Sequence, residues 1–337
     1  MRALVASGAR ELRIEDRDPD PSLGPVVFRP LYGGICGSDL HYSREGRVGA
    51  FAILEPLVLG HEVVGVVEED PTGRFPAGTR ATLHPGTSCG TCPECASGRP
   101  NLCRFARYLG SAASVPHTQG AFAERVMVRP DQVRALPEAL PTLRGVLAEP
   151  LGVGLHAIGR AGGVAGRRVL VSGAGPIGLL AAGAAVALGA GSVTVADVLA
   201  EPLATAALLG ATATVHLRDA APEPAGYDVV IEAAGVPAAL TAAVAATTRG
   251  GTVVQVGMLP AHPEPVALSA LVSREIELRG AFRFDDEIDD AVAMLADLPV
   301  FDAVITHVLP LGAYQEAFDI AADSARSSKV VLWMGDD

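Results

Sequence analysis

The chain has 337 residues, of which 49% are hydrophobic and 19% charged, and its formal net charge is -12. Single hydrophobic cores stop growing beyond roughly 250–300 residues, so we expect two domains. The acidic balance disfavours nucleic acid and anionic membranes as partners, because both favour clustered Lys and Arg.

The N-terminal stretch and the apolar runs bear on location. Residues 1–10, MRALVASGAR, lack a basic region followed by an apolar core of signal-peptide length. The most apolar run, residues 177–190, is shorter than the ~20 residues that a membrane-spanning helix needs. We therefore expect a cytoplasmic protein with no membrane partner.

Glycines surround a set of possible metal ligands between residues 33 and 62, GGICGSDLHYSREGRVGAFAILEPLVLGHE. Cys36 offers a thiolate, His61 an imidazole and Glu62 a carboxylate, a ligand set that suits zinc better than magnesium or calcium. Ser38 and His41 add a hydroxyl and a titratable imidazole beside it. A lone cysteine is more often inert packing, but the glycines at 33, 34, 37 and 60 indicate tight bends or close approach to a ligand. The segment predicts a catalytic zinc site.

A second cysteine pattern follows at Cys89, Cys92, Cys95 and Cys103, with spacing C-x2-C-x2-C-x7-C. Four thiolates close a tetrahedron around zinc and leave no open position, which predicts a structural site. Four unrelated thiols or an iron–sulfur cluster are the alternatives. A nucleic-acid zinc finger is disfavoured because the loop lacks a basic stripe. The cysteine spacing indicates metal binding in a reducing compartment rather than disulfides.

The sequence pattern changes near residue 167, where predicted strands and helices begin to alternate. An apolar run at 168–172 leads into Gly173, Gly175, Pro176, Ile177 and Gly178, and a long Ala- and Leu-rich helix is predicted to reach residue 190. Strand, G-x-G-x-x-G and helix in this order predict a dinucleotide site, with the pyrophosphate at the helix N-terminus.

The next predicted strand, residues 192–196, ends at Asp197. A carboxylate there accepts hydrogen bonds from the adenosine ribose hydroxyls and repels a 2′-phosphate, so NAD is favoured, with NADP possible. Glu201 or Arg218 could modify this preference. Gly235 and Gly257 end two later predicted strands, where loops meet the nicotinamide, although simple turn formation explains them equally well.

The remaining predicted strands and helices lie at the two ends of the chain. Apolar and polar residues that alternate between turn signals predict short strands within 1–32, 63–67 and 78–83, and further strands are predicted at 212–216, 227–235, 251–257 and 275–282. A helix is predicted at 237–248, and helix, strand, helix and strand at 288–298, 306–309, 314–322 and 329–333.

The two metal motifs and the glycine-rich turn, in this order, resemble the zinc-dependent medium-chain dehydrogenases, in their polyol dehydrogenase branch. The likeness is greatest to those that act on L-idonate, and it covers essentially the whole chain. It implies an α/β protein with a GroES-like, mainly-β catalytic domain at residues 1–150 and 287–337. A Rossmann domain with a doubly wound parallel sheet would occupy residues 151–286. It also implies two zinc ions per chain and a homodimer or homotetramer.

The resemblance assigns further site residues. Glu149 would face the catalytic zinc, directly or through water, although a helix-start carboxylate is the alternative. Residues 105–122 would border the substrate pocket, where His117 is either a further ligand or a packed histidine. Arg283 and Phe284 would contact substrate together with Tyr42 and Glu149, and the guanidinium could pair with a sugar-acid carboxylate. A plain surface arginine is the alternative for Arg283.

The reaction implied is hydride transfer from a secondary hydroxyl to NAD, with zinc lowering the pKa of that hydroxyl. The proton would leave through Ser38, the cofactor ribose and His41. Oxidation of L-idonate to 5-keto-D-gluconate is the leading expectation. Sorbitol, xylitol or threonine are alternative substrates, and a non-catalytic dinucleotide-sensing protein is the alternative from another class.

Overall fold

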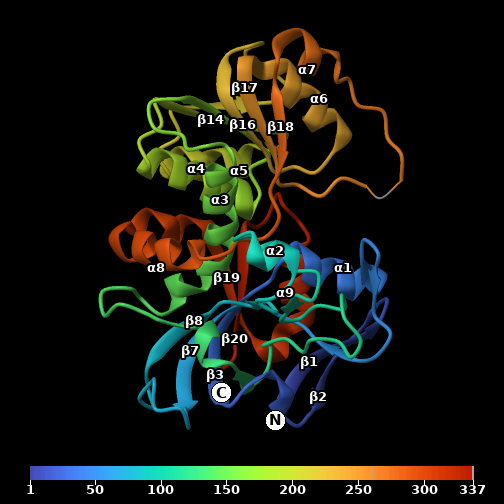
Figure 1. Cartoon of the computed structure of the whole chain (residues 1–337), viewed down its shortest axis with the longest axis vertical. Coiled ribbons are helices and arrows are strands. Elements are labelled where there is room, and N and C mark those ends of the chain that lie inside the picture. The colour runs from blue at the N-terminus through green and yellow to red at the C-terminus, as the bar shows by residue number, and fades with distance from the viewer. Residues whose placement is uncertain (261, 336–337) are drawn as a thin grey trace.

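The computed structural model describes residues 1–260 and 262–335, which form two large sheets (Figure 1). The first sheet has seven strands in the order β12-β8-β7-β3-β20-β19, with β11 also paired to β3. Its strands are β3 (Val26–Gly34), β7 (Glu62–Glu69), β8 (Arg80–Leu83), β11 (Val126–Val128), β12 (Val133–Ala135), β19 (Ile305–Pro310) and β20 (Lys329–Trp333). Because β20 pairs with β3, the last strand completes a sheet that the first 135 residues begin.

Short strands extend this mainly-β part. A three-stranded sheet contains β2 (Glu11–Asp16), β1 (Arg2–Gly8) and β6 (Leu57–Val58), and two small ladders pair β4 (Arg47–Val48) with β5 (Phe51–Ala52) and β9 (Gly86–Thr87) with β10 (Arg107–Tyr108). Helices α1 (Gly37–Glu45), α2 (Pro93–Ala96) and α9 (Tyr314–Ala321) lie beside them.

The second sheet is parallel throughout, in the order β15-β14-β13-β16-β17-β18. Its strands are β13 (Arg168–Ser172), β14 (Ser192–Asp197), β15 (Ala213–His216), β16 (Tyr227–Glu232), β17 (Thr247–Gln255) and β18 (Glu277–Gly280). Val169 and Val171 face one buried cluster and Leu170 another, as the period of two in a strand requires. Both faces are therefore covered, which is the usual state of a parallel sheet.

The helices of this half lie on both sides of the sheet. They are α3 (Ala148–Arg160), α4 (Pro176–Ala187), α5 (Ala200–Leu208), α6 (Pro237–Ala246), α7 (Ser269–Arg274) and α8 (Glu287–Asp297). In Figure 1, α3 and α8 lie between the two sheets. Six 3-10 helices occur in the described residues: Pro21–Leu23, Pro100–Leu102, Pro130–Gln132, Leu143–Leu147, Pro299–Val304 and Leu311–Ala313.

The predicted architecture, a mainly-β part and a doubly wound parallel sheet, is confirmed, and several element boundaries differ. The helix predicted at 237–248 ends at Ala246 and passes directly into β17, so residues 247–250 are strand. The strand predicted at 275–282 is shorter, and α7 precedes it. Helices α1 and α3 were not predicted, because their glycines and polar residues obscure the helical period. Within the described residues, no helix is long and apolar enough to cross a membrane.

Candidate functional site

Strand pairing brings the predicted zinc ligands together. Cys36 follows β3 and caps the start of α1, whereas His61 precedes β7 and Glu62 begins it. Gly34 pairs with Glu62 in the antiparallel β3–β7 ladder. As a result, one ligand atom from each of Cys36, His61 and Glu62 lies within 4.8 Å of the other two.

A buried aspartate holds the two ligand-bearing segments in place. Asp39 is fully buried and accepts hydrogen bonds from the Cys36 amide at 2.9 Å and from the Gly60 amide at 3.2 Å. Burial raises the pKa of Asp39, and the nearby His61 opposes that shift. Sequence reasoning missed this residue, although a carboxylate three residues after the start of a helix is a common capping arrangement.

Gly60 shows why a glycine must precede His61. Its φ is 93°, and a Cβ there would lie 2.2 Å from the Phe122 ring. The backbone therefore turns left-handed against an aromatic side chain, which a residue with a Cβ would not tolerate.

The surroundings of His61 suit a cation. Its Nδ1 is buried and has no hydrogen-bond partner among the described residues, so one ring nitrogen is left for a ligand. Burial lowers the pKa of His61, but the nearby groups of Cys36, Asp39 and Glu149 outweigh it and raise the pKa to about 10. An environment that stabilises an imidazolium also stabilises a divalent metal ion. Thiolate, imidazole and carboxylate are the donors that zinc uses, so these residues fit that ion.

Glu62 has a second partner that sequence reasoning missed. The Lys329 ammonium lies 2.7 and 2.6 Å from the two Glu62 carboxylate oxygens and donates to the Ile35 carbonyl at 3.1 Å. Both side chains are almost fully buried. A signal was available, because Lys329 is the only lysine in the sequence and begins an apolar strand.

Glu149 lies in the first turn of α3, outside the group of mutually close ligand atoms. It is buried, and its Oε1 accepts a hydrogen bond from the Tyr108 hydroxyl at 2.5 Å. Burial raises the pKa of Glu149, while His61 and the Tyr108 hydrogen bond lower it. Of the two candidate carboxylates, the geometry therefore places Glu62 with Cys36 and His61.

Tyr108 also connects the cluster to Arg283. Its ring centroid lies 5.6 Å from that of His61, and the Arg283 guanidinium carbon lies 3.9 Å from its ring centroid. Arg283 is half-buried and makes no hydrogen bond or ion pair with any described residue, and burial lowers its pKa. Tyr108 lies in the predicted pocket-bordering segment but was not singled out, because nothing in its local sequence marks it.

The other predicted residues of the mainly-β part vary in exposure. Ser38 is half-buried in the first turn of α1, and His41 is exposed and lies 2.9 Å from Glu45 Oε1. Tyr42 is buried, and its hydroxyl accepts from the Ala112 amide at 2.9 Å.

His117 is a packed histidine, because Ser114 O and the Leu54 amide engage its two ring nitrogens. Phe284 is buried against His84, with ring centroids 5.0 Å apart.

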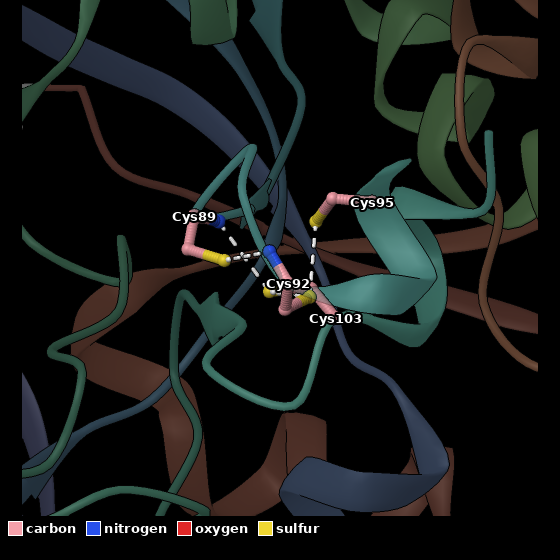
Figure 2. Close-up of side chains that lie close together, drawn as sticks. All are labelled: Cys89, Cys92, Cys95 and Cys103. Atoms are coloured by element: carbon pink, nitrogen blue, oxygen red, sulfur yellow. Dashed lines mark hydrogen bonds between the residues drawn. The ribbon is translucent and has the colours of Figure 1, made fainter. Parts of the chain in front are cut away.

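The four remaining cysteines converge in a separate lobe (Figure 2). One sulfur atom from each lies within 4.8 Å of the others, and the Cys92 sulfur is 3.4 Å from that of Cys95 and 3.8 Å from that of Cys103. Zinc–sulfur bonds of about 2.3 Å in a tetrahedron separate the sulfurs by about 3.8 Å, so the lobe fits zinc. Hydrogen bonds from the Thr91 and Cys92 amides lower the pKa of the Cys89 thiol to about 6, whereas burial and the neighbouring thiols raise that of Cys95 to about 11.

The predicted dinucleotide motif lines a cavity of about 460 Å³ that reaches the metal ligands. Its walls include Cys36, Glu62, the turn from Gly173 to Gly178, and Asp197. A Cβ on Gly178 would lie 1.9 Å from the Gly173 carbonyl oxygen, so the turn closes only with glycine there.

The loops around this cavity are held by carboxylates. Asp197 ends β14 and accepts from the Ala174 amide at 2.6 Å, which ties it to the glycine-rich turn. Gly235 and Gly257 do not line the cavity. They pack against one another, since a Cβ on Gly257 would lie 2.2 Å from the Gly235 nitrogen. Glu232, which was not predicted, is buried and accepts from the Gly235 amide at 3.0 Å.

Comparison with known proteins places the chain in a family. Residues 23–138 match the model of the alcohol dehydrogenase GroES-like domain, and residues 176–297 match that of the zinc-binding dehydrogenases. The chain is 35% identical to L-idonate 5-dehydrogenase (NAD(P)(+)) of Escherichia coli K12, over 98% of both chains. It is 36% identical to sorbitol dehydrogenase of Bacillus subtilis 168, over 88% of this chain and 86% of that one.

Solved structures agree. The crystal structure of L-idonate 5-dehydrogenase from Escherichia coli K-12 has a TM-score of 0.94 at 34% identity, covering 99% of this chain and 98% of that one. A protein from Sinorhizobium meliloti 1021, crystallised with NADP as a candidate zinc-binding dehydrogenase, has a TM-score of 0.88 at 31% identity over 99% of both chains. The predicted GroES-like and Rossmann folds are thus confirmed, and the chain belongs to the zinc-binding medium-chain dehydrogenases, oxidoreductases of the polyol dehydrogenase branch.

Proposed function

We propose that this NAD(P)-dependent zinc dehydrogenase oxidises a secondary hydroxyl of a sugar acid, with L-idonate, converted to 5-keto-D-gluconate, as the specific substrate. Identity does not separate the relatives, since the L-idonate and sorbitol enzymes are 35% and 36% identical to this chain. The observation that carries the proposal is Arg283. Its side chain is half-buried against Tyr108, whose ring in turn neighbours that of His61, and it makes no ion pair with any described residue.

A guanidinium in this setting suits a carboxylate. Arg283 stacks on Tyr108, which fixes the plane of its five N–H donors without using them. The charge of Glu149 acts on Arg283, but the two side chains form no ion pair in the described structure, and Glu149 Oε1 instead accepts from the Tyr108 hydroxyl. A carboxylate bound by arginine in two parallel hydrogen bonds is recognised by geometry as well as charge, whereas a polyol offers only neutral hydroxyls.

The chain's own residues have distinct proposed roles in the reaction. Cys36, His61 and Glu62 would hold the catalytic zinc, and Asp39 fixes the backbone of their two segments. When bound, zinc supplies Lewis acidity that lowers the pKa of a hydroxyl, and the nicotinamide supplies the hydride acceptor. Ser38, on the same helix, would take part in carrying the released proton to the exposed His41, and His41 would pass it to solvent.

We also propose NAD as the preferred cofactor. Asp197 lies beside the glycine-rich turn, in the cavity that also contains Cys36. A carboxylate at this place accepts from both ribose hydroxyls and repels a 2′-phosphate. The domain boundaries at 1–150, 151–286 and 287–337, the homodimer or homotetramer and the cytoplasmic location implied by the resemblance stay predictions.

A polyol dehydrogenase is the second candidate, supported by the relationship to sorbitol dehydrogenase. Replacement of Arg283 separates the two. In Arg283→Gln the kcat/KM for L-idonate should fall by about 10- to 150-fold, which corresponds to about 1.5–3 kcal/mol for hydrogen bonds to a charged group, while that for sorbitol changes far less. Arg99→Gln is the matched control, because Arg99 is exposed and makes no side-chain hydrogen bond with any described residue. Equal losses on both substrates in Arg283→Gln would argue against the sugar acid.

A further inference from the structure

Arg283 lies on a segment whose backbone needs support. Strand β18 ends at Gly280 and α8 begins at Glu287, so residues 281–286 carry the chain from the parallel sheet to that helix. Arg283 has a φ of 53°, in the left-handed region that disfavours any residue with a Cβ. Such a conformation persists only where surrounding contacts fix it.

Two side chains from the mainly-β part supply contacts on either side of Arg283. Asn101 Nδ2 donates to the Phe282 carbonyl at 3.0 Å, and His84 Nε2 lies 2.8 Å from the Asp285 carbonyl oxygen. Asn101 belongs to the four-cysteine lobe, and His84 directly follows β8. The carbonyls that flank Arg283 are therefore both engaged by residues remote in sequence.

The ring of His84 is itself oriented. Its Nδ1 lies 3.1 Å from the Gly86 amide nitrogen and 2.9 Å from the Gly86 carbonyl oxygen, which holds the ring against this residue. Because a carbonyl oxygen can only accept, Nε2 carries the proton that it donates to the Asp285 carbonyl. The ring edge also packs on Phe284. At the same loop, the Asp285 amide donates to Glu287 Oε2 at 2.6 Å.

We infer that Asn101 and His84 are positioning residues for the substrate, which hold the Arg283 backbone so that its guanidinium rests on Tyr108. Both line the same cavity of about 60 Å³ as Arg283 and Tyr108. The inference rests on the proposed function, in which Arg283 binds the carboxylate of a sugar acid. The four-cysteine lobe then does more than stabilise its own loop, because it presents Asn101 to the substrate-binding segment.

Two independent variants test this. Asn101→Ala removes one donor, and His84→Phe removes the other while keeping a ring against Phe284. Loss of one neutral hydrogen bond should raise the KM for L-idonate by about three- to tenfold in each variant. Because the KM for L-idonate rises, the ratio of kcat/KM for L-idonate to kcat/KM for sorbitol should fall. His84→Gln, which restores an N–H donor, should recover part of the ratio, and Arg99→Gln in the same lobe as Asn101 should leave it unchanged.

A purely structural role would lower activity on both substrates alike. Binding of 5-keto-D-gluconate to the zinc-loaded enzyme, measured by calorimetry, gives a readout independent of turnover and should weaken by the same factor in both variants. Unchanged ratios and binding in Asn101→Ala and His84→Phe, with a lowered ratio in Arg283→Gln, would overturn this inference alone. An unchanged ratio in Arg283→Gln would overturn the proposed function itself.

Discussion

Replacement of Lys329 by methionine should destabilise the protein strongly. The lysine is 2% exposed, and its ammonium is the partner of both oxygens of the equally buried Glu62. Lys329→Met keeps the apolar stem but removes the ammonium that contacts both oxygens of the buried Glu62 carboxylate, and breaking a buried ion pair in this way costs about 3–5 kcal/mol. With an unfolding entropy of about 2.1 cal/mol/K per residue, 337 residues give about 0.7 kcal/mol/K, so the Tm should fall by about 4–7 °C if the chain unfolds as one unit.

The assay is calorimetry of the zinc-free protein, with the double variant Lys329→Met/Glu62→Gln as control. Removing both charges should recover much of the loss, because no uncompensated charge remains. Burial lowers the pKa of Lys329, but Glu62 and Cys36 outweigh it and raise the pKa. Because the pKa of Lys329 is higher in the folded than in the unfolded chain, its contribution to the free energy of unfolding is complete at any pH below the unfolded-state pKa. That contribution is lost only as the pH rises through the folded-state pKa. The Lys329 ammonium therefore contributes throughout the range from pH 6 to 9, and a Tm difference should be present at every pH in it. A Tm within 1 °C of wild type, or a double variant less stable than Lys329→Met, would show that the Lys329–Glu62 pair does not stabilise the fold in this way.

Three further predictions concern the metal, the cofactor and Glu149. Nearby anionic groups raise the pKa of His61 to about 10, so zinc must displace its proton, and the apparent zinc affinity of this site should rise about tenfold per pH unit from pH 6 to 8. Competition with a chromophoric chelator, with the four-cysteine site already loaded, measures this affinity. An affinity that does not depend on pH would contradict the prediction. Asp197→Ala should raise kcat/KM for NADP relative to NAD, and an unchanged ratio would show that another residue sets the preference. Tyr108→Phe removes a hydrogen bond that lowers the pKa of Glu149, so the pKa of Glu149 should rise and the acidic limb of the pH profile of kcat/KM should move to higher pH. An acidic limb that stays in place would exclude a role for the Tyr108–Glu149 pair in this profile.

The parts of the site that follow from local spacing were predictable from sequence. The four cysteines and the glycine-rich turn each lie within a short segment, so their spacing alone fixes the geometry that a metal or a pyrophosphate needs. Cys36 and His61 are 25 positions apart, yet the glycines around Cys36 and the glycine directly before His61 marked both as special.

The remaining parts depend on pairings that no local pattern encodes. Lys329 reaches Glu62 only because β20 inserts beside β3, and Tyr108 meets Glu149 only because β10 packs near the start of α3. The contacts of Asn101 and His84 with the Arg283 segment span about 180 and 200 positions, respectively. Arg283 was identified by resemblance, but only the three-dimensional structure shows that its guanidinium lies over Tyr108 and makes no ion pair with the described residues.

We expect this enzyme to select a carboxylate-bearing substrate through Arg283. Initial rates of NAD reduction by the zinc-loaded wild type, measured over a concentration series of L-idonate and of sorbitol, test it most directly. We expect a kcat/KM for L-idonate at least about tenfold above that for sorbitol, which corresponds to about 1.4 kcal/mol. A kcat/KM for sorbitol equal to or above that for L-idonate would contradict it.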